Sequence, residues 1–274
     1  MATSTIKITD LIKRGGQITY SFEITSDITV DELNNVSIEP AFYSVTWHAK
    51  SHQCKNLDIA PIKTATLLKN LGKNVLMHIS CDMMKKDYLD ELLILLKEKS
   101  ICNLFVVLGE NFDSNSSDFQ STLEMIKYIK GKTGDYFAAG IAGFPDSTDE
   151  KIQQIKEKID GGADFILTQA FFDSNIFKTY VERCKKFGIE VPIVPGVFPF
   201  ETYKQLNNFI NMCKVKVSED LLEKAKSCQD QDESCVGIIR TLIGDLTNNL
   251  NVKHIHLFTL NKLKNNCELI KSLQ

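Results

Sequence analysis

The chain has 274 residues, of which 43% are hydrophobic and 24% are charged, a composition typical of a globular protein. Its formal net charge of -3 and isoelectric point near 6.0 argue against nucleic acid or an anionic membrane as a partner. No apolar run approaches the roughly 20 residues that a membrane helix needs. The sequence therefore predicts a protein that works without nucleic acid or a membrane.

The eight cysteines form no Cys-x-x-Cys pair, and several, such as Cys81 and Cys102, fall in apolar runs. This pattern is typical of reduced thiols inside a cell and not of a disulfide framework. The N-terminal stretch MATSTIKITDLIKRGG carries Asp10 and lacks the apolar region of a secretory signal. We therefore expect a cytoplasmic protein.

Runs with the composition and period of strands alternate with runs of helical period along the whole chain. The predicted strands are Ile18–Ile24, Phe42–Trp47, Asn74–Ser80, Asn103–Gly109, Phe137–Gly143, Phe165–Leu167, Pro192–Gly196 and Lys253–Thr259. The predicted helices are Asp31–Val36, Ile59–Leu71, Lys85–Lys99, Phe119–Lys130, Asp149–Asp160, Ile176–Phe187, Glu201–Met212, Ser218–Gln229, Ser234–Asn248 and Leu260–Ser272.

Eight strands, each followed by a helix, indicate parallel βαβ units with right-handed crossovers. This number of units within about 250 residues favours an α/β fold of the closed (β/α)8 TIM-barrel type over an open sheet. Two extra helices precede the eighth strand. Because no linker or break in composition is visible, residues 1–274 are predicted to form one barrel domain.

In such barrels the functional site lies at the carboxyl ends of the strands. The polar residues at or just beyond the predicted strand ends are Glu23, Thr46, His48, His78, Ser80, Glu110, Gln169, Thr259 and Asn261. Gln169 follows the buried run of the segment KIDGGADFILTQAFFD, which spans residues 158–173. It is either a ligand-binding amide or a group that only satisfies the local backbone.

Glu23 stands inside the apolar and aromatic run Tyr20–Ile24, where an ionised carboxylate is costly to desolvate. Burial raises the pKa of a carboxyl group and makes it a candidate general acid near neutral pH. The alternative is an ion pair between Glu23 and a lysine at the barrel mouth.

Other chemical motifs are weak. The spacing His48-x3-His52-x-Cys54 suits a metal, but it stands in a polar loop without a companion cluster, so no metal site is predicted. His254 and His256 alternate on one strand face, where packing positions are more common than ligands. Cys81 has no paired base in the sequence and is expected to be a core thiol. No Walker or Rossmann glycine motif is present.

Several segments in order resemble the catalytic barrel of the methylenetetrahydrofolate reductase family. They are SFE, SVTW, MHISC, VLGE, KIDGGADFILTQAFFD, PIVPGVFPFETYKQLNNF and HIHLFTLNK, and the resemblance runs from about Gly15 to Ile270. It implies reduction of methylenetetrahydrofolate to methyltetrahydrofolate, with FAD carrying hydride from NADH or NADPH. A homo-oligomer is compatible with it.

The resemblance also implies roles for individual residues. Glu23 matches the acid that protonates the folate ring nitrogen, and Gln169 matches an amide used by folate and nicotinamide in turn. The catalytic set is then Glu23, Glu110 and Gln169, and the substrate-binding set is Glu110, Gln169, Gln205, Phe209 and Lys262. The cofactor-binding positions are Thr46, Trp47, His78, Leu108, Gly109, Glu110, Ser121, Phe144 and Lys158.

Some of these positions depart from the family pattern. Leu108 replaces an arginine, Glu110 an aspartate and Lys262 an arginine, and Ser121 replaces a tyrosine on a helix. Phe144 replaces a tyrosine and Thr148 a histidine, within a loop that is shortened here. These changes predict weakened FAD binding and leave two alternatives open: a divergent folate-binding or regulatory paralogue, or a flavin-independent reductase. A barrel lyase or aldolase is a further alternative, although no Schiff-base lysine ends a strand.

Overall fold

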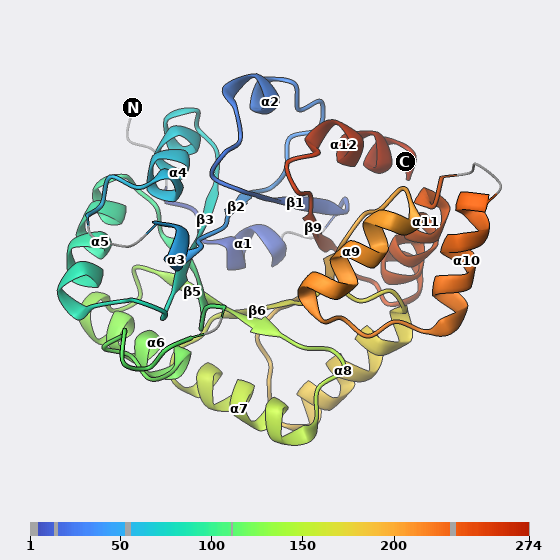
Figure 1. Cartoon of the computed structure of the whole chain (residues 1–274). Coiled ribbons are helices and arrows are strands. Elements are labelled where there is room, and N and C mark those ends of the chain that lie inside the picture. Colours follow the sequence, from blue (N-terminus) through green and yellow to red (C-terminus); the bar gives the residue numbers. More distant parts are fainter. Residues whose placement is uncertain (1–4, 14–15, 53–55, 111, 231–233, 274) are drawn as a thin grey trace.

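The strands of the protein form one parallel barrel, which a computed structural model describes for residues 5–13, 16–52, 56–110, 112–230 and 234–273 (Figure 1). Every neighbouring pair is parallel, and the hydrogen-bonded order is β7-β6-β5-β4-β3-β2-β1-β9-β8. The strands are β1 Thr19–Ile24, β2 Tyr43–Val45, β3 Val75–Ser80, β4 Asn103–Val107, β5 Ala138–Gly143, β6 Phe165–Thr168, β7 Ile193–Val194, β8 Gly196–Val197 and β9 His254–Phe258. The predicted TIM-type α/β barrel is confirmed.

The seventh predicted strand is present but divided into β7 and β8 by Pro195. Proline has no amide hydrogen for the ladder, so regular pairing is interrupted at this residue. The chain still closes the barrel, because β7 pairs with β6 and β8 pairs with β9. The Pro195 carbonyl accepts from the amide of His256 at 3.0 Å, and the amide of Gly196 donates to Thr168 Oγ1 at 2.9 Å.

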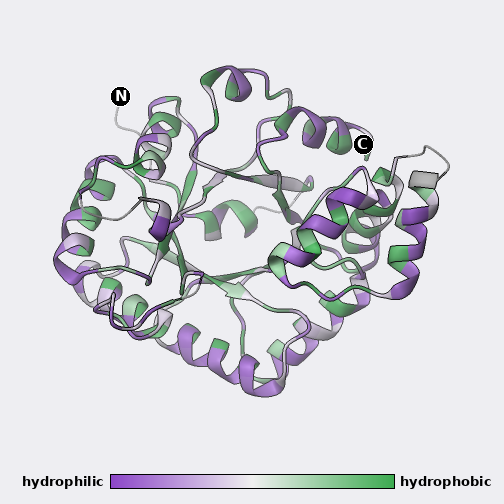
Figure 2. Cartoon of the chain, in the orientation of Figure 1, coloured by the Kyte–Doolittle hydropathy of each residue, from purple (hydrophilic) through white to green (hydrophobic). Residues whose placement is uncertain are grey.

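Helices surround the barrel, and Figure 2 shows hydrophilic residues along their outer faces, as on α7. The predicted helices are all present, with shifts at their ends, and α7 has the predicted bounds. The helices are α1 Ile8–Lys13, α2 Val30–Asn34, α3 Ala49–His52, α4 Ala60–Asn70, α5 Lys86–Glu98, α6 Thr122–Thr133, α7 Asp149–Asp160, α8 Ser174–Lys186, α9 Tyr203–Cys213, α10 Glu219–Asp230, α11 Val236–Gly244 followed by the π-helical turn η1 Asp245–Asn249, and α12 Leu263–Lys271.

The short helix α1 was not predicted, and it lies in the middle of the ring of strands (Figure 1). Ile8 and Leu11 of α1 pack against side chains inside the barrel, among them Phe105. The amide of Ile8 also donates to the side-chain oxygen of Asn103 at 2.8 Å. Because Asn103 begins β4, this contact places α1 at the amino-terminal end of the barrel, opposite the mouth. A six-residue helix held by such distant contacts leaves little local signal in the sequence.

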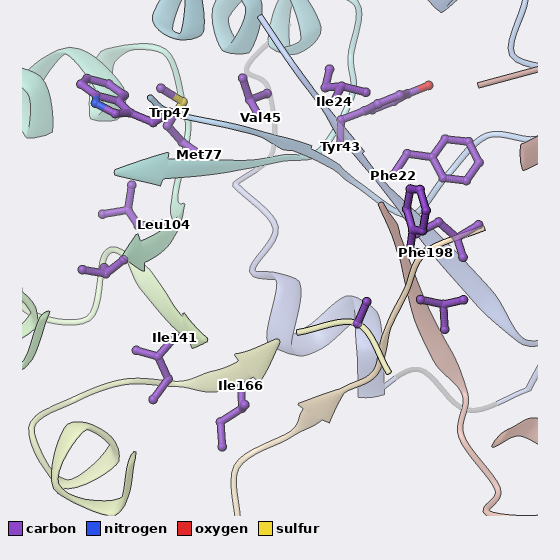
Figure 3. Close-up of a cluster of buried hydrophobic side chains, with 14 of the residues drawn as sticks. Phe22, Ile24, Tyr43, Val45, Trp47, Met77, Leu104, Ile141, Ile166 and Phe198 are labelled. Carbon is purple, nitrogen blue, oxygen red and sulfur yellow. The ribbon is translucent and has the colours of Figure 1, made fainter. Parts of the chain in front are cut away.

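Two apolar layers hold the barrel together. The larger lies between strands and helices, and Figure 3 shows part of it, including Ile24, Val45 and Ile166. The smaller fills the amino-terminal part of the interior and includes Phe42, Leu76 and Phe165 together with α1. Other interior positions are polar and buried, namely Ser21, Ser44, His78, His254 and His256. The polar interior leads to the carboxyl ends of the strands, where Glu23 stands.

Candidate active site

Glu23 ends the inward-facing series of β1, and its side chain is 20% exposed at the barrel mouth. It pairs in register with Ser44 of β2 on one side and Phe258 of β9 on the other. Its carboxylate oxygen Oε2 lies 3.9 Å from Nε2 of His78 on β3. The alternative of an ion pair with a lysine is not seen, since no lysine among the described residues forms an ion pair with Glu23.

Burial controls the charge of both groups. It raises the pKa of Glu23 from 4.5 to about 8, so this carboxyl group is largely protonated near neutral pH. Burial, aided by the nearby His48, lowers the pKa of His78 from 6.5 to about 3, so the imidazole is neutral there. The contact between Glu23 and His78 is therefore not an ion pair near pH 7. Glu23 has the protonation state that a general acid requires.

Residues that follow the neighbouring strand β9 hold the backbone around Glu23 in place. The hydroxyl of Thr259 donates to the backbone carbonyl of Glu23. Two residues later, Asn261 accepts from the amide of Thr25 at 2.9 Å and donates to Asp27 at 3.0 Å. Leu260 and Asn261 both have positive φ, of 47° and 60°, which is uncommon for residues other than glycine. The turn after β9 thus clamps the loop that follows Glu23.

The two glutamines of the predicted site, Gln169 and Gln205, each use the side-chain oxygen to accept a hydrogen bond from a nearby backbone amide. Gln169 Oε1 accepts from the amide of Ala170 at 3.0 Å, and Gln205 Oε1 accepts from the amide of Glu201 at 2.8 Å. The local backbone therefore occupies the oxygen of each side chain, as one of the two readings of Gln169 expected. The side-chain NH2 groups of both glutamines donate no hydrogen bond within the described residues. They are therefore available as donors to a ligand.

A cavity of about 210 Å³ opens between α9, α11 and α12, beside Thr259. It is lined by the predicted substrate residues Gln205, Phe209 and Lys262. The Phe209 ring stacks on Phe198 with 3.8 Å between centroids and is only 4% exposed. The Lys262 side chain is exposed at the rim and has no carboxylate partner within the described residues.

The predicted cofactor residues Thr46 and Trp47, which directly follow β2, point in opposite directions. Thr46 follows the inward-facing Ser44, and its buried hydroxyl has no hydrogen-bond partner within the described chain. Trp47 instead belongs to the outer apolar layer (Figure 3). Its ring meets the ring of Tyr88 edge-on. Its indole nitrogen is also buried without a partner among these residues. Only Thr46 of this pair directs its side chain to the interior.

Two other predicted cofactor positions are associated with α7: Phe144 contacts Lys151 of this helix, and Lys158 stands in its last turn. The Lys151 ammonium lies 5.9 Å from the centre of the Phe144 ring, which is 41% exposed. Lys158 is half-buried, and burial lowers the pKa of its ammonium, with the Cys81 thiol and Lys151 close enough to act on it. Within the described residues Lys158 forms no ion pair, so a half-buried cation stands without a counter-ion.

The remaining positions surround the end of β4. Gly109 has a φ of +106°, and a Cβ there would lie 2.5 Å from Ser80 Oγ, so only glycine fits. Leu108 is 42% exposed. Ser121 caps α6 by accepting from the amide of Glu124 at 3.2 Å. The hydroxyl of Ser121 is thus already engaged in capping a helix.

The carboxyl groups of Glu110 and Glu23 both affect the pKa of Cys213, the last residue of α9. Burial and then these two carboxyl groups raise the pKa of the Cys213 thiol to about 11. Glu110 stands just beyond the carboxyl end of β4, and both carboxyl groups are close enough to Cys213 to affect its pKa. The place of Cys213 near these carboxyl groups was not predicted from the sequence. Ser44 of β2 was also missed, although the alternation of side chains places it on the same inner face as Thr46, which follows the strand.

Within the described ranges, no three His, Cys, Asp or Glu side chains gather to hold a metal ion. Cys54 and the His52 side chain of the weak metal motif lie outside the described residues. His254 and His256 are buried inside the barrel and bonded to Ser21, as packing positions would be. In the part of the chain that the structure describes, no helix has the length and apolar character to cross a membrane.

Comparison with solved structures supports the fold. A Clostridium thermocellum protein, described as binding two copies of 5-methyl-5,6,7,8-tetrahydrofolic acid, superposes with a TM-score of 0.64 over 95% of both chains at 14% identity. Oxaloacetate acetylhydrolase superposes with a TM-score of 0.56 over 97% of this chain and 84% of its own, at 11% identity. At these identities the likeness concerns the barrel alone.

Comparison of sequences goes further. Methylenetetrahydrofolate reductase (NADH) 1 of Arabidopsis thaliana is 28% identical over 98% of this chain and 51% of its own length. Methylenetetrahydrofolate reductase 2 of Saccharomyces cerevisiae is 29% identical over 93% and 48%. The chain thus spans about half the length of these relatives, whereas it covers 87% of the Pectobacterium carotovorum 5,10-methylenetetrahydrofolate reductase at 27% identity. Residues 7–274 match the family as a whole, and the chain belongs to the methylenetetrahydrofolate reductase family.

Proposed function

We propose that this protein reduces 5,10-methylenetetrahydrofolate to 5-methyltetrahydrofolate, with NADH or NADPH as the reductant and FAD as the hydride carrier. The observation that carries the proposal is Glu23, a protonated carboxyl group at the mouth of a barrel of this family. Relatives are named for both NADH and NADPH, so the choice of nicotinamide stays open.

Glu23 supplies the proton in this proposal. It protonates a ring nitrogen of the folate, which opens the methylene bridge and leaves an iminium carbon that accepts hydride. Its raised pKa keeps the proton available near neutral pH, and the Thr259 and Asn261 contacts hold the loop and backbone around it. Glu110 stands just beyond the carboxyl end of β4, where a carboxylate can bind the amino and ring N–H donors of a pterin.

The cavity beside Thr259 is the proposed folate site. The NH2 group of Gln205, which lines this cavity, suits an acceptor atom such as the pterin carbonyl. Gln169 does not line the cavity, and its NH2 group is proposed to contact the folate from the end of β6. Phe209 offers an aromatic surface for the aryl group, and the exposed ammonium of Lys262 suits the carboxylates of the glutamate tail. The folate-bound Clostridium thermocellum protein with the same fold supports a folate as the ligand.

The residues present fit a flavin in part of the mouth. The unpartnered hydroxyl of buried Thr46 suits a polar atom of the cofactor, and the unpaired ammonium of Lys158 suits a phosphate or ribityl oxygen. Gly109 and His78 complete this set in the proposal. When bound, FAD would pass hydride from the nicotinamide to the substrate.

A second function has its own supporting observation. Leu108 and Phe144, which stand where the family has polar or charged residues, are 42% and 41% exposed hydrocarbon surfaces at the mouth. They offer no charge or hydrogen bond to a cofactor. The alternative is therefore a divergent protein that binds folate as a carrier or regulator, or passes hydride directly from nicotinamide to folate.

The absorbance spectrum of the purified protein separates these functions. A flavin band that is bleached by NADH or NADPH and restored by methylenetetrahydrofolate supports the reductase. A colourless protein that gains no activity from added FAD would overturn it, and titration with 5-methyltetrahydrofolate would then test for folate binding alone. Lys158→Gln provides a matched variant, because it removes one cation proposed to hold the flavin and leaves Glu23 in place.

The setting proposed for this activity is the cytoplasm, with the barrel acting as a single domain. All cysteines that the structure describes are free thiols, which is the state expected in a reducing compartment.

A further inference from the structure

Ser44 Oγ lies 2.6 Å from Nε2 of His78, and the same nitrogen lies 3.9 Å from the carboxyl oxygen of Glu23. We propose that Ser44 is a positioning residue: its hydroxyl occupies His78 Nε2 and thereby prevents His78 from taking the proton of Glu23. The inference rests on the proposed function only for the catalytic use of that proton. The three groups come from the neighbouring strands β1, β2 and β3.

A histidine beside a carboxylic acid can remove the proton that the acid needs for catalysis. Transfer of the proton from the carboxyl group to the imidazole gives an ion pair, and the positive imidazolium then lowers the pKa of the carboxyl group. Glu23 in that state has no proton to give near neutral pH. The site must therefore hold His78 close to Glu23 without letting its nitrogen act as a base.

The hydrogen bond to Ser44 has this effect in either direction. A neutral imidazole has one nitrogen that donates and one that accepts. If the Ser44 hydroxyl donates to Nε2, the lone pair of that nitrogen is used. If Nε2 carries the hydrogen and donates to Ser44 Oγ, the nitrogen has no lone pair to offer. In both cases the nitrogen that faces Glu23 has no free lone pair that could accept the proton of Glu23.

Because the site is buried, only Ser44 among the described residues is in a position to keep His78 Nε2 hydrogen-bonded. The serine is fully buried and the His78 side chain is 9% exposed, so bulk water does not compete for Nε2. Loss of the hydroxyl would leave the lone pair of a buried nitrogen unpaired, which is costly. The nearest proton that can satisfy it is that of Glu23.

The other titratable groups around this pair do not supply the same control. His48 and His256 face His78, and a positive charge on any of these three would oppose a charge on the others. Cys213 faces Glu23 from α9, with Glu110 acting on it as well. Its raised pKa leaves the thiol uncharged near neutral pH. Ser44 is the group that engages Nε2 itself.

The test follows the protonation state of Glu23 directly. The infrared carbonyl band of its protonated carboxyl group, assigned by its loss in Glu23→Gln, is titrated against pH in the wild type and in Ser44→Ala. We expect the variant to shift the titration of Glu23 down by at least about one pH unit, which is a tenfold loss of protonated acid above the pKa. An unchanged titration would overturn the proposal.

Ser21→Ala is the matched control. Ser21 is also a fully buried serine inside the barrel, and it bonds to His254 at 3.0 Å and His256 at 2.8 Å, but not to His78. The same loss of a buried hydroxyl should leave the titration of Glu23 unchanged. An equal shift in Ser21→Ala would attribute the effect to general loosening of the interior and reject a special role for Ser44.

A double-variant cycle then asks whether Ser44 acts through His78. In a His78→Gln background, Ser44→Ala should no longer move the titration of Glu23. A shift of the same size in that background would mean that Ser44 acts on Glu23 without the histidine, against the proposal. If Ser44→Ala does not fold, ¹⁵N NMR of the wild-type imidazoles decides, with His78→Gln for assignment. His78 must be neutral at pH 7, and an imidazolium would overturn the proposal.

None of these measurements requires flavin, folate or turnover. A colourless protein without reductase activity would refute the proposed function and leave the infrared result intact. An unchanged Glu23 titration in an active yellow enzyme would refute the role of Ser44 alone.

Discussion

Glu23→Gln should change how the stability of the protein depends on pH. The pKa of Glu23 is raised from 4.5 in its ordinary state to about 8 in the fold, so the folded protein holds a proton that the unfolded chain releases between these values. Stability falls as pH rises wherever the folded state binds more protons. The wild type therefore loses stability across this window, and glutamine, which does not titrate, removes the loss.

The magnitude follows from the shift. Each unit of pKa difference is worth about 1.4 kcal/mol, so the contribution of Glu23 changes by up to about 5 kcal/mol from pH 4.5 to pH 8. The buried histidines have lowered pKa values and act in the opposite direction below about pH 6.5. They are present in both proteins, so the difference between wild type and variant isolates Glu23.

Urea unfolding at a series of pH values gives the free energy of unfolding of both proteins. The variant should gain stability relative to the wild type by about 1 kcal/mol per pH unit through this window. A difference that stays constant from about pH 5 to pH 8 would show that Glu23 ionises like an exposed glutamate. The assignment of this residue as an acid near neutral pH would then fail.

Further predictions concern catalysis and packing. In the proposed reductase, Glu23→Gln should leave reduction of the flavin by NADH or NADPH intact and abolish reduction of folate, as stopped-flow absorbance of the two half-reactions would record; loss of both would mark Glu23 as structural. Gly109→Ala should lower the thermal midpoint more than Gly72→Ala, because both glycines have positive φ but only Gly109 has neighbours that a Cβ would strike. Equal effects would remove the steric argument. Ile8→Ala should cost about 2–5 kcal/mol in chemical unfolding, because Ile8 is fully buried where α1 meets the barrel interior; a cost near zero would mean that α1 is not part of the cooperative fold.

The barrel could be predicted from the sequence because its units repeat. Each strand is short, apolar and followed by a helix of regular period, so counting the units was enough to indicate a closed barrel. The division of the seventh strand is a local effect of Pro195 that the count did not resolve. Helix α1 could not be predicted, since Ile8 and Leu11 gain their stability from residues of several distant strands.

The candidate site could be predicted less completely. The place of Glu23 at a strand end, within an apolar run, was enough to identify it as a candidate acid. Its neutral neighbour His78 and the hydrogen bond between His78 and Ser44 depend on the register and stagger of three strands, which sequence patterns do not specify. The hydrogen bond from the Ala170 amide to the Gln169 side-chain oxygen could not be predicted from the sequence either.

The division of the barrel wall at Pro195 has a consequence for how the protein moves. With a residue that cannot donate to the ladder, the junction of β7 and β8 has fewer backbone bonds to break than the long strands, so we expect it to open first in native-state hydrogen exchange. Phe198 follows β8 directly and stacks on Phe209 in the cavity wall. The junction of β7 and β8 is thus in contact with the proposed folate site through Phe198. A bound folate should therefore slow amide exchange at Gly196 and Val197.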